Sequence, residues 1–236
     1  MPMKRLSLEV VNKTGSRPVE FVVRKMVNAG YVGRDRAAVE AHIEELRRAG
    51  VAPPPSVPMV FPVLSHNITT SGPIEVLGKK TSGEVEYVLL MDGGKVLVGV
   101  GSDHTDRELE SYSIVQSKQV CYNVLSPTVW EYDEVEAVWD ELLIQSWVRP
   151  KGTAEEVLYQ KAPLATILSA EKLMSLVESK LVGTVKDGLV IFSGTVPILT
   201  GEVICGDTFR CELRNPKTGG SLHCEYDVSV LNFLRD

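Results

Sequence analysis

The sequence of 236 residues has few cysteines, and their positions do not suggest a metal site or a disulfide framework. They are Cys121, Cys205, Cys211 and Cys224. None of them forms a CxxC pair, and no group of cysteines and histidines has the spacing of a structural zinc site. Near the N-terminus there is no apolar segment of the roughly 7–15 residues that a secretion signal needs. We therefore expect reduced cysteines and a soluble, cytoplasmic protein.

Long apolar runs and an excess of basic residues are also missing. No apolar run approaches the ~20 residues that a membrane span requires. The 31 acidic side chains outnumber the 25 basic ones, which gives a formal net charge of −6 and a pI near 5.4. Non-specific nucleic-acid binders are basic. With 44% hydrophobic residues, the chain is also too apolar to be disordered. These absences predict a folded protein that binds neither membranes nor nucleic acids.

The sequence contains no internal repeat and no regular alternation of strands and helices, so a doubly wound parallel sheet is not expected. Alternating or β-branched apolar segments predict strands over 6–11, 19–27, 59–64, 84–91, 95–102, 142–148, 189–197, 207–214 and 222–228. Helices are predicted over 33–50, 105–111 and, as the longest, 163–181. The DGG sequence at 92–94 predicts a hairpin turn. Together these segments predict a single α+β domain that is rich in strands.

Two glutamates begin the strand predicted over 84–91. Glu84 and Glu86 are two residues apart, so both carboxylates project from one face of the strand, followed there by Val88 and Leu90. Asp103 ends the strand on the other side of the hairpin turn and is expected close to both glutamates. Three carboxylates suit a hard cation such as Mg²⁺ or Mn²⁺. The alternatives are exposed glutamates without a role and an Asp103 that caps the helix over 105–111.

Two further patterns could carry chemistry. His42 and Glu45 are three residues apart in a predicted helix, so they share a face and could form a base with its orienting carboxylate. Most such pairs are ordinary surface residues. Gly194 and Thr195 lie in a turn of small residues after an apolar strand, where backbone N–H groups and a hydroxyl could bind an anion. The alternative is an ordinary transition from strand to loop, and Lys118 alone could be a solvated lysine.

Taken in order, these segments resemble motifs of the fumarylacetoacetate hydrolase superfamily. GRDRAAVEAHIEE resembles the GxNYxxHxxE segment of that superfamily, and EVEYVLLM resembles its ExE strand. SDHTDRE resembles the D-x-[ST]-x-R-[DE] run, and QSK resembles the stretch with the active-site lysine. DGLVIFSGTVP and GDTFRCEL resemble the GDVILTGTP segment and the strand after it. The sequence departs from the pattern in its short DGG turn and in lacking the NY pair, as an uncharacterised bacterial offshoot would.

The resemblance implies a mixed β-sandwich or β-roll with few helices, forming a single catalytic domain over 1–236. Residues 1–55 would contribute N-terminal strands and a lid-like helix, and residues 56–236 a metal-binding β core. The implied roles follow from the matching positions: metal ligands Glu84, Glu86 and Asp103; catalytic residues His42, Glu45 and Lys118; substrate-binding residues Arg107, Gly194 and Thr195.

The activity that the resemblance implies is a divalent-metal-dependent hydrolysis of a C–C bond in a small acylpyruvate or β-diketo acid. Mg²⁺ or Mn²⁺ would polarise the substrate, His42 would activate water, and Lys118 with Arg107 would stabilise an oxyanion or a carboxylate. Thr195 would bind the far carboxylate. Decarboxylation, hydration and tautomerisation of a 2-oxo acid are alternatives on the same site, and a non-catalytic binding module is another. The resemblance also implies a homodimer.

Overall fold

Two β-sheets pack against each other in the computed structural model, which describes residues 3–48, 53–183 and 187–234. The larger sheet contains β1 (Lys4–Asn12), β2 (Gly15–Val23), β3 (Lys25–Gly30), β4 (Met59–Val63), β5 (Ile68–Thr69), β8 (Val85–Asp92), β9 (Lys95–Asp103), β11 (Asn123–Leu125), β12 (Thr128–Glu131) and β15 (Leu189–Phe192). Its main path has the order β2-β1-β12-β9-β8-β15-β3-β4, and β11 joins β5 to β9. The strands β8 and β9 therefore lie in the middle of this sheet. Glu86 lies in β8, Asp103 ends β9, and Glu84 directly precedes β8.

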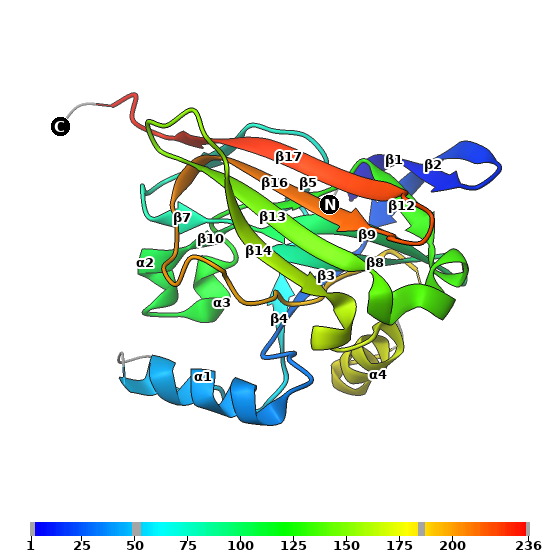
Figure 1. Cartoon of the computed structure of the whole chain (residues 1–236), viewed down its shortest axis with the longest axis horizontal. Helices are drawn as coiled ribbons and strands as arrows, with labels where there is room; N and C mark the ends of the chain where they lie inside the picture. The colour runs from blue at the N-terminus through cyan, green and yellow to red at the C-terminus, as the bar shows by residue number, and fades with distance from the viewer. Residues whose placement is uncertain (1–2, 49–52, 184–186, 235–236) are drawn as a thin grey trace.

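The smaller sheet covers the middle of the larger one, as Figure 1 shows. It contains β6 (Ile74–Val76), β13 (Leu143–Pro150), β14 (Val157–Pro163), β16 (Gly206–Arg214) and β17 (Ser221–Val230). These strands follow the order β14-β13-β16-β17-β6. A separate ribbon pairs β7 (Thr81–Ser82) with β10 (Thr105–Asp106), just before and just after the β8–β9 hairpin. The β-rich α+β fold predicted from the sequence is confirmed.

The helices lie at the edges of the sheets. They are α1 (Arg36–Arg48), α2 (Arg107–Glu110), α3 (Ile114–Ser117) and α4 (Ala170–Lys180), with 3₁₀ turns over Tyr132–Glu134, Glu136–Glu141 and Leu164–Thr166. In Figure 1, α1 lies at the lower margin of the molecule, below α2 and α3. Across the described residues, none of the helices has the length and apolar character needed to cross a membrane.

The helix predicted over 163–181 was wrong in its first part. Pro163 ends β14, a 3₁₀ turn follows, and the α-helix begins only at Ala170. Ser169 caps this helix, since its side chain accepts a hydrogen bond from the backbone N–H of Lys172. The apolar residues between 163 and 169 are therefore buried by a strand end and a turn rather than by a longer helix. Similarly, the strand predicted over 19–27 is divided at Arg24 into β2 and β3.

Alternate residues of β8 face two different hydrophobic cores. Val85, Tyr87 and Leu89 belong to the core between the two sheets. Val88 and Leu90 belong to a second core that the larger sheet encloses with side chains from β1, β2, β3 and β15. Glu86 shares the face of Val88 because side chains alternate along a strand. Its carboxylate is thus placed at the end of an otherwise apolar interior.

The β8–β9 hairpin has the turn that the sequence predicts. Gly93 and Gly94 both adopt positive φ angles, of 56° and 86°, which an Asp-Gly-type two-residue turn requires. In the resulting register Glu86 lies opposite Gly101. The short turn therefore brings the end of β9 next to the first residues of β8, as expected for Asp103 and the two glutamates.

Gly101 has no side chain and so leaves space for the neighbouring strand β11. We expect that replacing Gly101 with Ala destabilises the fold. A Cβ at this position would lie 2.5 Å from the carbonyl oxygen of Val124 and 2.8 Å from the ring of Phe192. Overpacking of this kind costs about 1–3 kcal/mol. Urea denaturation should show this loss in Gly101→Ala, with little change in Gly78→Ala, whose nearest neighbour would be 3.5 Å away. Equal stability of the two variants would contradict the assigned packing.

Candidate metal and substrate site

Three carboxylates converge at the end of the β8–β9 hairpin. Glu84, Glu86 and Asp103 each place an oxygen within 4.8 Å of the others. The two strands hold them there, because the N–H of Glu84 donates to the carbonyl of Asp103 at 3.1 Å and the N–H of Asp103 donates back at 3.0 Å. Glu86 and Asp103 are buried, whereas the Glu84 side chain is 22% exposed. The sequence prediction that these side chains lie together is confirmed.

The donor set fits a hard divalent cation. All three groups offer carboxylate oxygens, the ligands that Mg²⁺ and Mn²⁺ prefer. Oδ1 of Asp103 is buried and has no hydrogen-bond partner in the structure, which is costly unless a ligand satisfies it. The residues present are therefore suited to hold such a cation, with Asp103 at the buried side and Glu84 at the exposed side.

Lys118 partly balances the charge of the carboxylates. It follows the short helix α3 and forms a buried ion pair between its Nζ and Oδ2 of Asp103. Burial alone would lower the pKa of Lys118, but the attraction of Asp103, Glu84 and Glu86 outweighs it and raises the pKa. The lysine therefore stays charged. The solvated lysine considered as an alternative is excluded, because Lys118 is 5% exposed.

Burial raises the pKa of Glu86 well above its ordinary value, and the charge of Asp103 raises it further. The positive charge of Lys118 acts in the opposite direction. The backbone N–H of Gly194 donates to Oε2 of Glu86 at 2.8 Å, which fixes the carboxylate. Gly194 has a φ of 81°, and a Cβ there would lie 2.7 Å from Val32. The predicted turn is therefore at the site, with its glycine amide bound to a carboxylate of the protein.

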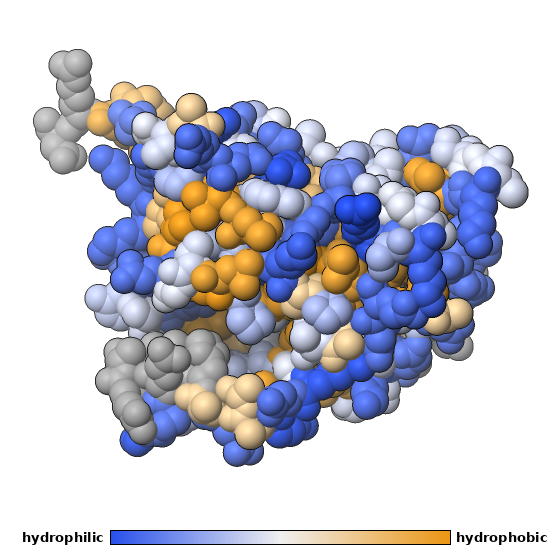
Figure 2. Space-filling model, viewed as in Figure 1, coloured by the Kyte–Doolittle hydropathy of each residue, from blue (hydrophilic) through white to orange (hydrophobic). Residues whose placement is uncertain are grey.

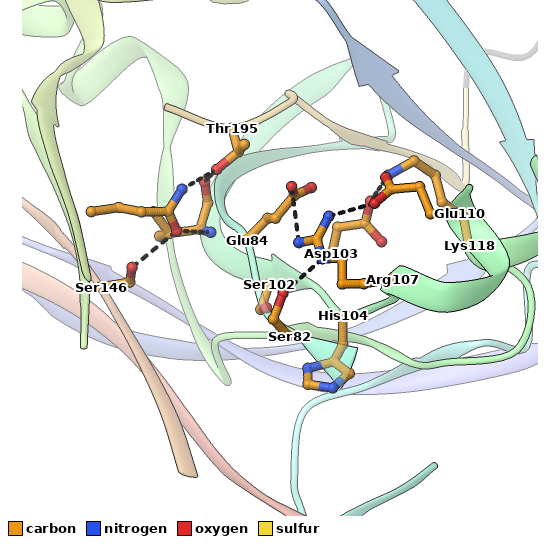
Figure 3. A network of polar contacts seen from close by, with 12 residues as sticks. Ser82, Glu84, Ser102, Asp103, His104, Arg107, Glu110, Lys118, Ser146 and Thr195 are labelled. Carbon is orange, nitrogen blue, oxygen red and sulfur yellow. Dashed lines mark hydrogen bonds and ion pairs between the residues drawn. The ribbon is translucent and has the colours of Figure 1, made fainter. Parts of the chain in front are cut away.

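Thr195 lies beside the carboxylates and is part of a hydrogen-bond network. Its hydroxyl donates to the carbonyl of Val85 at 2.8 Å and accepts from Nε2 of Gln160 at 2.7 Å. Oε1 of Gln160 accepts from the N–H of Val85 at 3.0 Å and from the hydroxyl of Ser146 at 3.0 Å. Figure 3 shows this network next to Glu84. It fixes the start of β8, and with it the direction of both glutamates.

Arg107 is held by three side chains (Figure 3). Its guanidinium contacts Glu84 Oε1 at 3.0 Å and Glu110 Oε2 at 2.9 Å, and its Nε donates to the Ser82 hydroxyl at 2.7 Å. Burial would lower the pKa of Arg107, but Glu84 and Glu110 raise it. The helix that begins at Arg107 is capped by Asp106, whose Oδ1 accepts from two backbone N–H groups at 3.0 Å. Asp103 therefore does not cap this helix.

His104 follows Asp103 but points away from the carboxylates in Figure 3. Its Nδ1 lies 2.9 Å from the hydroxyl of Tyr226 in β17. Burial lowers the pKa of His104 to about 3, helped by the charges of Arg107 and Lys151. The imidazole is therefore neutral at physiological pH and is part of the packing between the sheets.

The two remaining predicted residues lie in α1. The structure confirms a helix over His42 and Glu45, but both side chains are outside the described part of the structure. Their role as a base and its orienting carboxylate stays a prediction.

Sequence reasoning missed residues around the carboxylates. Glu110 is three residues after Arg107, and this spacing in a helix could have indicated the pair. Tyr31 is a non-glycine residue with a φ of 58°, a strained backbone that nothing in the sequence signals. Burial raises the pKa of Tyr31, and the charge of Glu110 raises it further, whereas the charge of Lys118 lowers it. Asn123, opposite Asp103 in the sheet, donates to Oδ1 of Asn28 at 3.1 Å.

The comparisons with known proteins place this arrangement in a family. The family described as protein of unknown function (DUF2848) matches residues 29–226. The chain belongs to the DUF2848 family. No curated protein sequence matches it. The matched residues of this DUF2848 protein include the three carboxylates, Lys118 and Arg107.

Solved structures show the fold that this DUF2848 protein adopts. Cg1458 with an inhibitor is 17% identical, with a TM-score of 0.65 over 97% of this chain and 100% of that one. Fumarylacetoacetate hydrolase from psychrophilic Exiguobacterium antarcticum is 17% identical, with a TM-score of 0.61 over 93% and 83%. A 2-keto-3-deoxy-D-arabinonate dehydratase complexed with magnesium and 2,5-dioxopentanoate is 16% identical, with a TM-score of 0.61 over 93% and 78%. The fold is that of the fumarylacetoacetate hydrolase superfamily, which confirms the expectation from the motifs.

Proposed function

We propose that this DUF2848 protein is a divalent-metal-dependent enzyme that hydrolyses a C–C bond in a small acylpyruvate or β-diketo acid. The observation that carries the proposal is the convergence of Glu84, Glu86 and Asp103 within 4.8 Å, with a buried Asp103 oxygen that has no partner. Burying these charges together is costly, and a bound cation would offset that cost. The fold supports the proposal, because one solved neighbour is a hydrolase and another holds magnesium with a dioxo acid.

In this proposal Glu84, Glu86 and Asp103 hold Mg²⁺ or Mn²⁺. The cation, when bound, supplies a positive charge that polarises the oxo group of the substrate. Lys118 fixes Asp103 and adds a second positive charge close to the developing oxyanion. Gly194 fixes Glu86, and Thr195 fixes the start of β8. His42, oriented by Glu45, would take a proton from the attacking water.

The reaction consumes one water molecule. Its oxygen adds to the acyl carbonyl carbon, the adjacent C–C bond breaks, and the bonding electron pair stays on the departing carbon, which then takes a proton. The products are two acids. Dehydration or hydration of a 2-oxo acid is the second candidate, because a dehydratase that acts on a keto-deoxy acid shares the fold. Decarboxylation and tautomerisation use the same polarised oxo group.

Product analysis separates these reactions. The purified protein should be incubated with Mg²⁺ or Mn²⁺ and with acylpyruvates, oxaloacetate-like acids, β-diketones and 2-keto-3-deoxy-D-arabinonate, and the products followed by NMR. Hydrolysis gives two acids from an acylpyruvate or an oxaloacetate-like acid, and one acid with one ketone from a β-diketone. Decarboxylation gives carbon dioxide, and dehydration gives one product that has lost water. We expect turnover that stops with a chelator and returns with metal. Absence of both turnover and metal uptake would contradict the proposal and leave a binding module.

A further inference from the structure

The site has an exposed rim, and Arg107 lies on it. Asp103 forms the buried floor, with a fully buried side chain, whereas the Arg107 and Glu110 side chains are 17% and 28% exposed. The Arg107–Glu110 pair is therefore the more exposed part of this cluster, where an outward-extending end of a bound substrate would lie. Figure 3 shows Arg107 between Glu84 and Glu110, directly beside the carboxylate cluster.

Arg107 is already neutralised at this rim. The resemblance gives it the role of binding a substrate oxyanion or carboxylate, but its three guanidinium nitrogens contact Glu84, Glu110 and Ser82 at 2.7–3.0 Å. Two of these partners are negatively charged, and the pairs keep the arginine in one position. A second carboxylate would have to compete with ion pairs that are preformed and partly buried, which is unfavourable.

The charges around the site lead to the same conclusion. Four carboxylates, those of Glu84, Glu86, Asp103 and Glu110, face two cations, Lys118 and Arg107. With all four carboxylates ionised, the formal net charge of these groups is −2. A divalent cation would bring these groups to neutrality. One substrate carboxylate can then bind against the added cation. A second carboxylate on the same substrate would lie near Glu110. None of the six named side chains would have an unpaired positive charge to balance it.

We propose that Glu110 makes the enzyme selective for oxo acids with a single carboxylate and an uncharged far end. This inference rests on the proposed function and names its substrate class. Glu110 acts by neutralising Arg107 and by repelling a second negative charge at the rim. The sequence motif suggested that a second substrate carboxylate binds at the Thr195 turn. We expect this end of the substrate to carry a carbonyl, hydroxyl or alkyl group instead. Thr195 agrees with this, because its hydroxyl is already bound to Val85 and Gln160.

The test compares two ligands of the same length that differ by one carboxylate. Binding of 2-oxopentanoate and of 2-oxoglutarate to the Mg²⁺-loaded full chain would be measured by calorimetry. We expect the monoanion to bind at least about tenfold more tightly, the size of a charge repulsion across a partly exposed site. In Glu110→Gln, which keeps a hydrogen-bond acceptor for Arg107, the affinity for 2-oxoglutarate should rise about tenfold and that for 2-oxopentanoate should change little.

Glu108→Gln is the matched control. Glu108 lies on the same short helix, but its side chain is 67% exposed and its partner is Lys80 at 3.8 Å. Its removal should leave the ratio of the two affinities unchanged, whereas a purely structural role of Glu110 would weaken both ligands together. Tighter binding of 2-oxoglutarate by the unchanged protein, or an unchanged ratio in Glu110→Gln, would overturn the inference. Binding of neither ligand to the Mg²⁺-treated protein would overturn the proposed function itself.

Discussion

Replacing Glu86 with Gln is expected to abolish Mg²⁺ binding and, with it, the activity. The substitution removes one negative charge from three and changes a strong oxygen ligand into a weak one. The loss of Mg²⁺ affinity should exceed the roughly 10–100-fold loss that follows when a residue that hydrogen-bonds to a metal ligand is replaced. Activity should fall by at least about 100-fold. Isothermal titration with Mg²⁺ and Mn²⁺ measures the first effect, and NMR of the products measures the second.

The variant is suited to this test because its fold should survive. An amide oxygen at position 86 can still accept the hydrogen bond from the N–H of Gly194. Burial already raises the pKa of Glu86, so the loss of the charge removes a cost in the metal-free state. Glu75→Gln, an exposed change in β6, is the control and should bind metal like the unchanged protein. Full Mg²⁺ affinity in Glu86→Gln would show that the carboxylates do not form a metal site.

Replacing Lys118 with Met is expected to destabilise the metal-free protein by about 3–5 kcal/mol. The substitution leaves the buried Asp103 carboxylate without its ion-pair partner, next to a second buried carboxylate on Glu86. Chemical denaturation in the presence of a chelator measures the change in the free energy of unfolding. Because a bound cation supplies positive charge at the same place, saturating Mg²⁺ should restore part of the lost stability.

A surface lysine provides the comparison. Lys95 pairs with Glu131 at 3.0 Å, but its side chain is 60% exposed. Lys95→Met should therefore cost no more than about 1 kcal/mol, with no response to Mg²⁺. If the two variants lost equal stability, or if Mg²⁺ had no effect on Lys118→Met, the lysine would not be coupled to a metal site.

The parts of the site that depend on local chain geometry could be predicted from the sequence. The two-residue spacing of Glu84 and Glu86 fixes their shared face, and the DGG turn fixes the register that brings Asp103 next to them. These contacts lie within one hairpin, so alternation and turn chemistry were enough. The superfamily resemblance placed Lys118 and the turn at Gly194 in the same region.

Contacts between distant segments could not be predicted from local patterns. The bond between Gly194 and Glu86 depends on β15 pairing with β8, which no local pattern signals. The pairing of Arg107 with Glu84 also depends on how separate segments are arranged, whereas the pairing with Glu110 follows from their three-residue spacing in a helix. The helix prediction over 163–181 was wrong in its first part because the apolar spacing there also suits a strand end and a 3₁₀ turn. These elements bury the same apolar residues that a helix would have buried.

The division of the site between β8 and the short helix α2 has a consequence for substitutions in the site. Glu86 lies in a strand whose neighbouring residues face two cores, so its surroundings cannot change without loss of stability. Arg107 and Glu110 belong to a helix of four residues that contributes no buried side chain. Substitutions in this helix therefore remove no side chain from either core. Under the proposed function, changes in α2 would alter which acids bind while the carboxylates of Glu86 and Asp103 stay in place.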